Sequence, residues 1–287
     1  MNKIIINDQL LDEKDGFISI NDRGFYFGDG VYDVIRVWDA ELFLPNEHIN
    51  RFFNSAAKIE IEVPFTKEEL LARLRKLMKE NNVQLGTIYF QLTRGSAPRI
   101  HQFPSKETKP TFIAFTTEKG IPESELRAGV EVVLKEDIRN HMCDVKSINL
   151  LPNILAKQFA KSQGCFEAVL HRGGIVTEGS STNIFIVKDE KIITHPTTNL
   201  ILNGITRQLV IELAEKNNIP VIQREFKVDE LMNADEVFLT STTSEVMPII
   251  KADGKIIGEG IPGKVTRKLQ KLVRERILHD VKMAQQK

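Results

Sequence analysis

The chain has 287 residues, a length that predicts two domains, each large enough to bury its own core. Its 39 lysines and arginines balance its 39 aspartates and glutamates, which argues against nucleic acid or an anionic membrane surface as a partner. Two cysteines without a metal-binding spacing exclude a disulfide framework and a zinc site, and no apolar run approaches the roughly 18 residues of a membrane span. We therefore expect a cytoplasmic protein that holds no metal and whose partners are small molecules or proteins.

The first 120 residues predict an α/β domain. Residues 31–38 are β-branched and aromatic with partial alternation, and Asp39-Ala40-Glu41 forms a turn that leads into Leu42-Phe43-Leu44. Thr66 and Glu69 have the spacing of a capping box, which marks the start of a helix. In chain order we expect a hairpin within 31–44, a helix after 46, a helix at 67–81, and strands at 87–94 and 111–117.

A polar, turn-forming segment at 119–124 is the predicted domain boundary. Beyond it, Gly164 ends a helix that has Pro152 in its first turn, and Gly173-Gly174 marks a second hairpin. We expect, in order, a strand near 130–138, the helix ending at 164, strands at 168–171, 175–178 and 183–187, a helix after 204, a strand at 236–239 and a helix from 264. Elements alternate irregularly, so the fold class is α+β, or mixed α/β, with domains at 1–120 and 121–287.

Lys146 and Glu178 both lie at the ends of predicted elements, where their side chains can converge. Together they suit a pyridoxal phosphate site, since a lysine amine forms a Schiff base with the aldehyde and a carboxylate keeps the ring nitrogen protonated. Each also has an ordinary interpretation. Lysines are commonly solvated surface charges, and a glutamate before Gly-Ser-Ser can simply end a strand.

Three segments are candidates for binding a phosphate. Asn203-Gly204-Ile205-Thr206 precedes an apolar helical run, and the free N–H groups at a helix N-terminus bind anions. Thr240-Ser241-Thr242-Thr243-Ser244 offers hydroxyl donors after a strand, and Arg51 offers a fixed positive charge on a helix face that also carries His48 and Ser55. The alternatives are an ordinary cap by Thr206, a Ser/Thr turn and a solvated helix face.

Arg99 and His101 are two residues apart in a loop stiffened by Pro98. In an extended segment their side chains point the same way and can grip a carboxylate, although a surface loop with incidental cations has the same composition. Tyr32 heads a strand, where tyrosines most often pack with a solvated hydroxyl. Gly28-Asp29-Gly30 lacks the third glycine of a dinucleotide fingerprint, and the chain has no Walker A, His-Glu-x-x-His or Gly-x-Ser-x-Gly motif.

Several motifs, in the correct order from the N-terminus to about Leu272, resemble the fold type IV pyridoxal phosphate enzymes, and within them the bacterial D-amino acid aminotransferases. The motifs are Asp22-Arg23-Gly24-Phe25-Tyr26-Phe27-Gly28-Asp29-Gly30-Val31-Tyr32, Asn46-Glu47-His48-Ile49-Asn50-Arg51, Lys146-Ser147-Ile148-Asn149 and Thr177-Glu178-Gly179-Ser180-Ser181. The resemblance implies a homodimer of two-domain subunits with the cofactor between the domains.

The same resemblance implies a role for each candidate residue. Lys146 would be the Schiff-base lysine and proton shuttle, and Glu178 the partner of the ring nitrogen. Leu202 would line the other face of the cofactor. The phosphate grip would comprise Arg51, Ile205, Thr206 and Thr242, with Ser241 beside it as a further cofactor-binding residue. The substrate carboxylate would bind Tyr32, Arg99 and His101, the last two reaching in from the other subunit.

The implied reaction is ping-pong transamination between D-amino acids such as D-alanine and 2-oxo acids such as 2-oxoglutarate, which becomes D-glutamate. The alternatives are a branched-chain L-aminotransferase, an aminodeoxychorismate lyase and a non-catalytic binding protein of the same fold. The Arg99 and His101 pair favours a D-amino acid aminotransferase over the branched-chain L-aminotransferase and the lyase. Asp33, Asn140 and Thr182 depart from the family pattern, which bears on the substrate side-chain range and leaves the reaction class intact.

Overall fold

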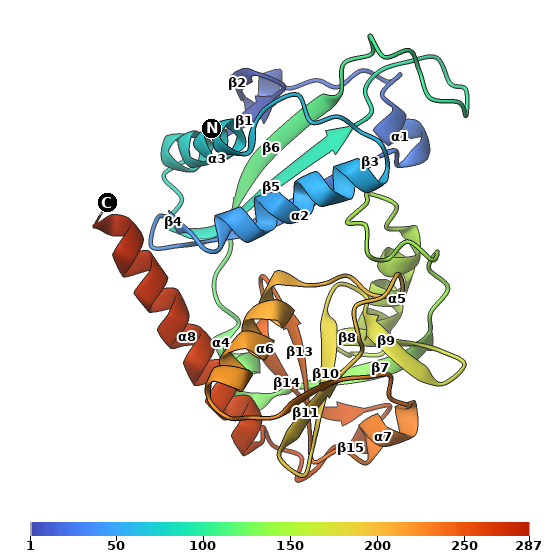
Figure 1. The fold of residues 1–287 in the computed structure, drawn as a ribbon, viewed down its shortest axis with the longest axis vertical. Helices are drawn as coiled ribbons and strands as arrows, with labels where there is room; N and C mark the ends of the chain where they lie inside the picture. The colour runs from blue at the N-terminus through green and yellow to red at the C-terminus, as the bar shows by residue number, and fades with distance from the viewer. Residues whose placement is uncertain (1, 287) are drawn as a thin grey trace. The chain divides into compact units, whose positions relative to one another are not determined.

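A computed structural model describes residues 2–286, which divide into two compact units (Figure 1). Unit 1 comprises the chain up to Gly120, the segment Val145–Asn149, and the end from Asp280 onward. Unit 2 comprises Ile121–Asp144 and Leu150–His279. The first segment of unit 1 ends at Gly120, and residues 145–149 belong to unit 1 although the residues on either side of them belong to unit 2. The reason is backbone pairing with a strand of unit 1, described below.

Unit 1 is built on a six-stranded antiparallel sheet in the order β2-β1-β6-β5-β3-β4. Its strands are β1 (Lys3–Ile6), β2 (Gln9–Asp12), β3 (Gly30–Trp38), β4 (Glu41–Leu42), β5 (Leu85–Thr93) and β6 (Thr111–Glu118). Its helices are α1 (Arg23–Phe27), α2 (Pro45–Lys58) and α3 (Lys67–Glu80), and a short 3-10 turn covers Glu13–Asp15.

One apolar core joins this sheet to α2 and α3. Phe52 of α2 packs on Phe90 of β5 with ring centroids 4.9 Å apart, and Leu70 and Leu74 of α3 are buried in the same cluster. The capping box forms as expected, because the Thr66 hydroxyl accepts a bond from the Glu69 backbone at 3.2 Å and the Glu69 carboxylate accepts one from the Thr66 backbone at 2.8 Å. Packing fixes α2, which carries the candidate Arg51, and packing and capping together fix α3.

Unit 2 contains a nine-stranded mixed sheet in the order β12-β11-β10-β13-β14-β7-β8-β9, with β15 paired to β14. Its strands are β7 (Val130–Glu136), β8 (Glu167–Arg172), β9 (Ile175–Gly179), β10 (Asn183–Lys188), β11 (Lys191–Thr194), β12 (Val221–Gln223), β13 (Glu236–Ser241), β14 (Glu245–Ala252) and β15 (Lys255–Ile256). Its helices are α4 (Glu123–Ala128), α5 (Leu151–Ser162), α6 (Ile205–Lys216) and α7 (Val228–Met232); α8 (Lys264–Gln285) belongs to unit 2 up to His279.

The core of unit 2 is formed by the buried faces of its strands. Val169, Val237 and Met247 lie in one cluster with Phe226 and Leu231, while Ala156 and Ala160 of α5 pack separately on β8. Strands and helices mix within both units, which confirms the expected mixed α/β class. Among the described residues, no helix combines the length and the apolarity needed to cross a membrane.

Candidate functional site

Lys146 is anchored to unit 1 through its backbone. Its carbonyl accepts a hydrogen bond from the Tyr32 N–H at 3.0 Å, and the Ile148 N–H donates to the Gly30 carbonyl at 3.1 Å. The Lys146 N–H donates to the hydroxyl of Ser55 on α2 at 3.1 Å. The segment thus pairs with the first residues of β3. Its lysine is held in position by both a strand and a helix of unit 1.

The structure brings Lys146 and Tyr32 together. The lysine Nζ lies 3.4 Å from the Tyr32 hydroxyl and 4.4 Å from the centroid of its ring. Tyr32 in turn stacks on Tyr89, with centroids 5.4 Å apart and ring planes 22° from parallel. Burial raises the pKa of Tyr89, so this second phenol stays neutral. Tyr32 therefore lies with its hydroxyl next to the amine, on a ring that stacks on Tyr89.

Arg51 is held by a buried carboxylate next to it. Its Nε and Nη2 donate to Asp33 at 2.8 Å each, and His48 Nδ1 lies 2.8 Å from the same carboxylate. His48 and Ser55 are each only 2% exposed, so the face of α2 that carries them and Arg51 is not the solvated face that the sequence left open. Burial alone would raise the pKa of Asp33, but Arg51 and His48 hold it well below its ordinary value. Asp33 is thus a permanent anion that orients Arg51 and leaves its Nη1 out of the pair.

Arg99 and His101 lie on an exposed loop of unit 1 and share one aromatic contact. The Arg99 guanidinium is 5.3 Å from the centroid of the Phe27 ring, and the His101 ring centroid is 5.6 Å from it. Arg23 holds the loop by donating to the Ile100 carbonyl at 2.7 Å. Within the described part of unit 1, neither Arg99 nor His101 contacts Lys146 or Arg51. The structure therefore groups this pair together but apart from the lysine of the same unit.

Glu178 is buried at the end of β9 in unit 2, with an exposed fraction of 5%. Its Oε2 accepts hydrogen bonds from Asn183 Nδ2 and from the Leu202 N–H, both at 3.0 Å, so the structure brings Glu178 and Leu202 together. Its Oε1 accepts a hydrogen bond from Arg139. Burial raises the pKa of Glu178, and the guanidinium of Arg139 opposes that shift.

The sequence-based reasoning missed the residues that surround Glu178. Arg139 is bound to Asp137, which also accepts a bond from Arg172 at 3.2 Å. One signal was available, because residues 137 and 139 are two apart at the end of a predicted strand and so share a face. No local pattern connects either of them to Arg172 or Asn183, which are brought close by strand pairing.

The two predicted phosphate segments of unit 2 meet through Asn183. Helix α6 begins at Ile205 after Gly204, and no side chain caps it, so Thr206 is not the cap that was the alternative. A Cβ at Gly204 would lie 2.2 Å from Asn183 Oδ1, and Asn183 is paired with Thr240 across β10 and β13. The N-terminus of α6 and the end of β13 therefore lie on either side of one asparagine.

The hydroxyl cluster after β13 combines two roles. The Ser241 hydroxyl accepts a bond from the Ser244 N–H at 3.0 Å, which is the Ser/Thr turn that the sequence left open. Thr240 Oγ1 is buried and has no hydrogen-bond partner among the described residues. Buried hydroxyls are rarely left unpaired, so this atom needs an acceptor or donor from outside the chain. Thr242 lies half-buried in the same turn.

The three departures from the family pattern have structural partners within their own units. Asp33 holds Arg51, as described above. Thr182 Oγ1 lies 3.3 Å from the buried carboxylate of Glu167, and the side-chain oxygen of Asn140 accepts a bond from the Met142 N–H at 3.0 Å. None of these contacts disturbs Lys146 or Glu178.

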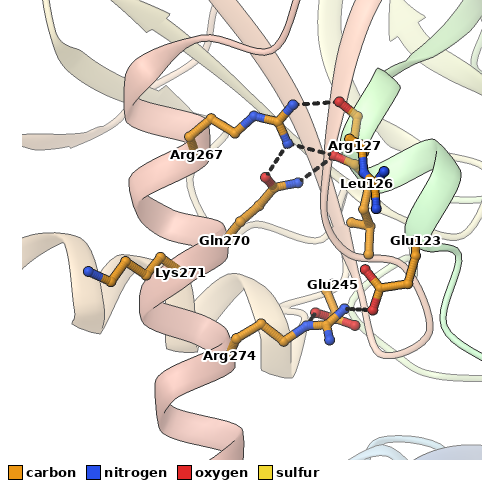
Figure 2. Close-up of a pocket in the computed structure, with 8 residues that line it drawn as sticks. All are labelled: Glu123, Leu126, Arg127, Glu245, Arg267, Gln270, Lys271 and Arg274. Carbon is orange, nitrogen blue, oxygen red and sulfur yellow. Dashed lines mark hydrogen bonds and ion pairs between the residues drawn. The ribbon is translucent and has the colours of Figure 1, made fainter.

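A cavity of about 370 Å³ lies elsewhere in unit 2 and contains none of the predicted site residues. Figure 2 shows that its polar side chains bind one another and backbone carbonyls: Arg274 pairs with Glu245 and Glu123, while Arg267 donates to the carbonyls of Leu126 and Arg127. Gln270 also donates to Leu126, at 3.0 Å. These contacts attach α8 to α4 and β14, so the residues around the cavity hold elements of unit 2 together. The predicted site lies outside this cavity.

Comparisons with known proteins agree on a family. Residues 30–252 match the family model described as amino-transferase class IV. A D-alanine aminotransferase from Staphylococcus epidermidis is 48% identical over 270 residues, covering 94% of this chain and 96% of that protein. One from Bacillus licheniformis is 44% identical over 278 residues, covering 97% and 98%. A solved branched-chain amino acid aminotransferase from T.th., with pyridoxamine 5'-phosphate, is similar with a TM-score of 0.89 at 28% identity, covering 96% of this chain and 93% of that one.

Proposed function

The chain belongs to the class IV aminotransferases, and on that basis we propose that it is a pyridoxal phosphate-dependent transaminase. It exchanges the amino group between D-amino acids such as D-alanine and 2-oxo acids such as 2-oxoglutarate in a ping-pong reaction. The D-alanine aminotransferases are 44–48% identical to it over nearly the full chain, whereas the branched-chain enzyme of similar fold is 28% identical. Sequence thus favours the D-amino acid reaction over the branched-chain L-reaction.

When bound, pyridoxal phosphate supplies an aldehyde that condenses with amino groups and a ring that accepts electrons. We assign Lys146 to hold the aldehyde covalently and Glu178 to face the ring nitrogen. Leu202 would line a face of the ring. The phosphate would be held by Arg51, Ile205, Thr206, Ser241 and Thr242.

Observations in each unit support this assignment. In unit 2, the uncapped start of α6 offers N–H groups to a phosphate, and the unpaired hydroxyl of Thr240 lies at the end of β13, next to Ser241. Glu178 is a buried carboxylate with a cationic neighbour, which suits a protonated nitrogen. In unit 1, Asp33 leaves Nη1 of Arg51 free of the carboxylate pair and able to donate to a phosphate oxygen. The chemistry of the donor set therefore fits the cofactor.

The chain's own catalytic work is proton transfer by Lys146. Its Nζ would move the proton of the substrate α-carbon, which needs a neutral amine in a fixed position. Backbone pairing to β3 provides the position, and the Tyr32 hydroxyl at 3.4 Å provides a hydrogen-bond partner for the amine. Tyr32 would then touch both the lysine and a substrate carboxylate.

We assign recognition of the substrate carboxylate to Tyr32, Arg99 and His101, with the last two contributed by the other subunit of a homodimer. Their separation from Lys146 within unit 1 supports a role across an interface. The surrounding segments also expose large apolar side chains, among them Phe25 at 79% and Ile20 at 75%, and such patches mark protein interfaces. Sedimentation equilibrium should then give about twice the 32.6 kDa of one chain. A mass of one chain would contradict this part of the proposal.

Borohydride reduction followed by peptide mapping tests the assignment of the lysine. Reduction should trap pyridoxal phosphate on Lys146 of the purified protein, and Lys146→Ala should abolish transfer from D-alanine to 2-oxoglutarate. Lys251→Ala, which removes a surface ion pair with Glu131, serves as the matched control and should keep full activity. A colourless protein with no labelled lysine, or an active Lys146→Ala variant, would refute the proposal. We also propose a cytoplasmic location, which cell fractionation tests.

A further inference from the structure

Four buried or half-buried charges of alternating sign end at Glu178. Arg172 donates to Asp137 at 3.2 Å, and Asp137 accepts two bonds from Arg139, at 2.9 Å from Nε and 2.8 Å from Nη2. Arg139 Nη1 then donates to Glu178. The side chains of Asp137, Arg139 and Glu178 are exposed by 0%, 7% and 6%, so little solvent screens these contacts.

Arg139 is fixed on every side of its guanidinium. Besides the two bonds to Asp137 and the one to Glu178, its Nη2 donates to the Leu200 carbonyl at 3.2 Å. Arg172 supports the same turn by donating to the carbonyls of Arg139 and Asn140 at 3.0 and 3.1 Å. Burial disfavours its charge, but Glu178 and Asp137 hold the pKa of Arg139 above its ordinary value. The positive charge next to Glu178 is therefore permanent and immobile.

Other ionisable groups near Glu178 contribute less. Burial raises the pKa of Cys143 to about 11, so its thiol is neutral in the ordinary pH range. Burial lowers the pKa of Arg207 to about 10, and the charge of Glu178 opposes that shift. The guanidinium of Arg207 donates to Asn203, His195 and Gln223 within the described chain. Arg139 is thus the cation that is hydrogen-bonded to the carboxylate.

The charge of Arg139 affects where the proton between Glu178 and the ring nitrogen resides. That proton can reside on the nitrogen, leaving a carboxylate, or on the carboxyl, leaving a neutral ring. Burial favours the second arrangement because it separates no charge. A cation in contact with the carboxylate disfavours protonation of Glu178 more strongly than it disfavours protonation of the more distant nitrogen. Arg139 therefore shifts the balance toward the charged ring.

We propose that Arg139 is a positioning residue for the transaminase reaction: it holds Glu178 as an oriented carboxylate, so that the shared proton resides on the ring nitrogen of pyridoxal phosphate. Asp137 and Arg172 act one step further away by keeping Arg139 in place. The inference rests on the proposed function, because it assigns Glu178 to that nitrogen. It adds to the reaction a residue that touches neither substrate nor cofactor.

Nitrogen NMR of the holoprotein loaded with ring-¹⁵N pyridoxal phosphate tests the inference. The ¹⁵N resonance reports directly whether the ring nitrogen carries a proton, which activity alone does not. Two neutral replacements, Arg139→Gln and Arg139→Met, are compared with wild type, so that a folding failure in one leaves the other. Arg274→Met is the matched control, because Arg274 also pairs with two carboxylates of unit 2 and lines the cavity of Figure 2.

We expect a protonated ring nitrogen in wild type and in Arg274→Met, and a shift of the resonance toward the unprotonated position in the Arg139 variants. Arg139→Lys, which keeps the charge, should restore the resonance toward its wild-type position. A wild-type resonance in Arg139→Gln or Arg139→Met would overturn the inference while leaving the proposed function intact. A wild-type protein that binds no pyridoxal phosphate would overturn the proposed function and this inference with it.

Discussion

Asp33 and Asp137 are buried carboxylates, and each is held between two neighbouring side chains that hydrogen-bond to it. Asp33 lies between Arg51 and His48 in unit 1, and Asp137 lies between Arg139 and Arg172 in unit 2. Removing one member of such a buried group leaves an uncompensated charge, which costs far more than a surface ion pair contributes. The aspartates therefore fix two arginines, Arg51, which we propose binds the phosphate, and Arg139, which contacts Glu178.

The Asp137 group predicts a pH dependence of stability. Burial would raise the pKa of Asp137, but Arg139 and Arg172 lower it to about 2. Because the folded pKa is depressed, its stabilisation is fully present above the unfolded-state value near 4 and is lost as the pH falls through about 2. Asp137→Asn should lower the free energy of unfolding by about 2 kcal/mol at pH 7, and by roughly half of that at pH 3.

Urea unfolding of wild type and Asp137→Asn at the two pH values measures this difference. Asp235→Asn is a suitable control, because Asp235 is half-exposed and its ion pair with Lys188 is screened by solvent. A difference between wild type and Asp137→Asn that stays constant, or grows, between pH 7 and pH 3 would show that the carboxylate of Asp137 is not the source of the stabilisation.

At the residue scale, the sequence pointed to single candidate side chains but not to the partners that hold them. Lys146, Glu178 and Arg51 were found through motifs, and the spacing of Arg99 and His101 suggested a pair. Their supporting residues, such as Asn183 and Arg172, are distant in sequence from what they bind and carry no local pattern. From sequence, the α2 face that carries His48 could have been exposed to solvent. That interpretation is wrong, because His48 is buried in contact with Asp33 of β3.

At the element scale, the start of α6 depends on a glycine that has an ordinary backbone conformation. Gly204 has φ −62°, which any residue can adopt. A side chain at this position is therefore excluded by lack of space and not by the backbone conformation. A Cβ there would meet Asn183 Oδ1, and Asn183 donates to Glu178 at 3.0 Å and to the Leu202 carbonyl at 2.8 Å. The loop before α6 and the carboxylate of Glu178 are thus held by the same side chain.

Gly204→Ala should therefore weaken cofactor binding by about tenfold, or about 1.4 kcal/mol, since Asn183 must move from both acceptors. Titration of the apoprotein with pyridoxal phosphate, followed by absorbance, gives the dissociation constant. Gly120→Ala is the control, because a Cβ at Gly120 would meet no atom within 4 Å. Wild-type affinity in Gly204→Ala would mean that the Asn183 contact does not shape the site.

Most elements could be predicted because their signals are local. The capping box at Thr66 and Glu69, the helix start after Gly204 and the glycine hairpin at 173 and 174 all depend on residues a few positions apart. The pairing of residues 145–149 with β3 was not predictable, because those segments are more than a hundred residues apart in sequence. Nor were the short strands β1 and β2, which are defined by pairing with each other and with β6.

At the scale of the whole molecule, the chain distributes its candidate residues over two units. Lys146, Tyr32 and Arg51 lie in unit 1, while Glu178, Leu202 and the start of α6 lie in unit 2. The reaction class followed from ordered motifs, and the comparisons support it over the full chain. Physical patterns alone indicated a lysine and a carboxylate suited to pyridoxal phosphate, candidate phosphate-binding segments and a pair that can grip a carboxylate. They did not give the handedness of a substrate, which depends on where its carboxylate is held.

The most direct test of the account is a comparison of D-alanine with L-alanine, and of D-leucine with L-leucine, each supplied to the holoprotein with 2-oxoglutarate. We measure the initial rate of 2-oxo acid formation from each donor, with Lys146→Ala as the background. The account predicts turnover of D-alanine well above that of L-alanine, with D-glutamate as the second product. A strict preference for L-leucine would contradict it and assign the chain to the branched-chain reaction.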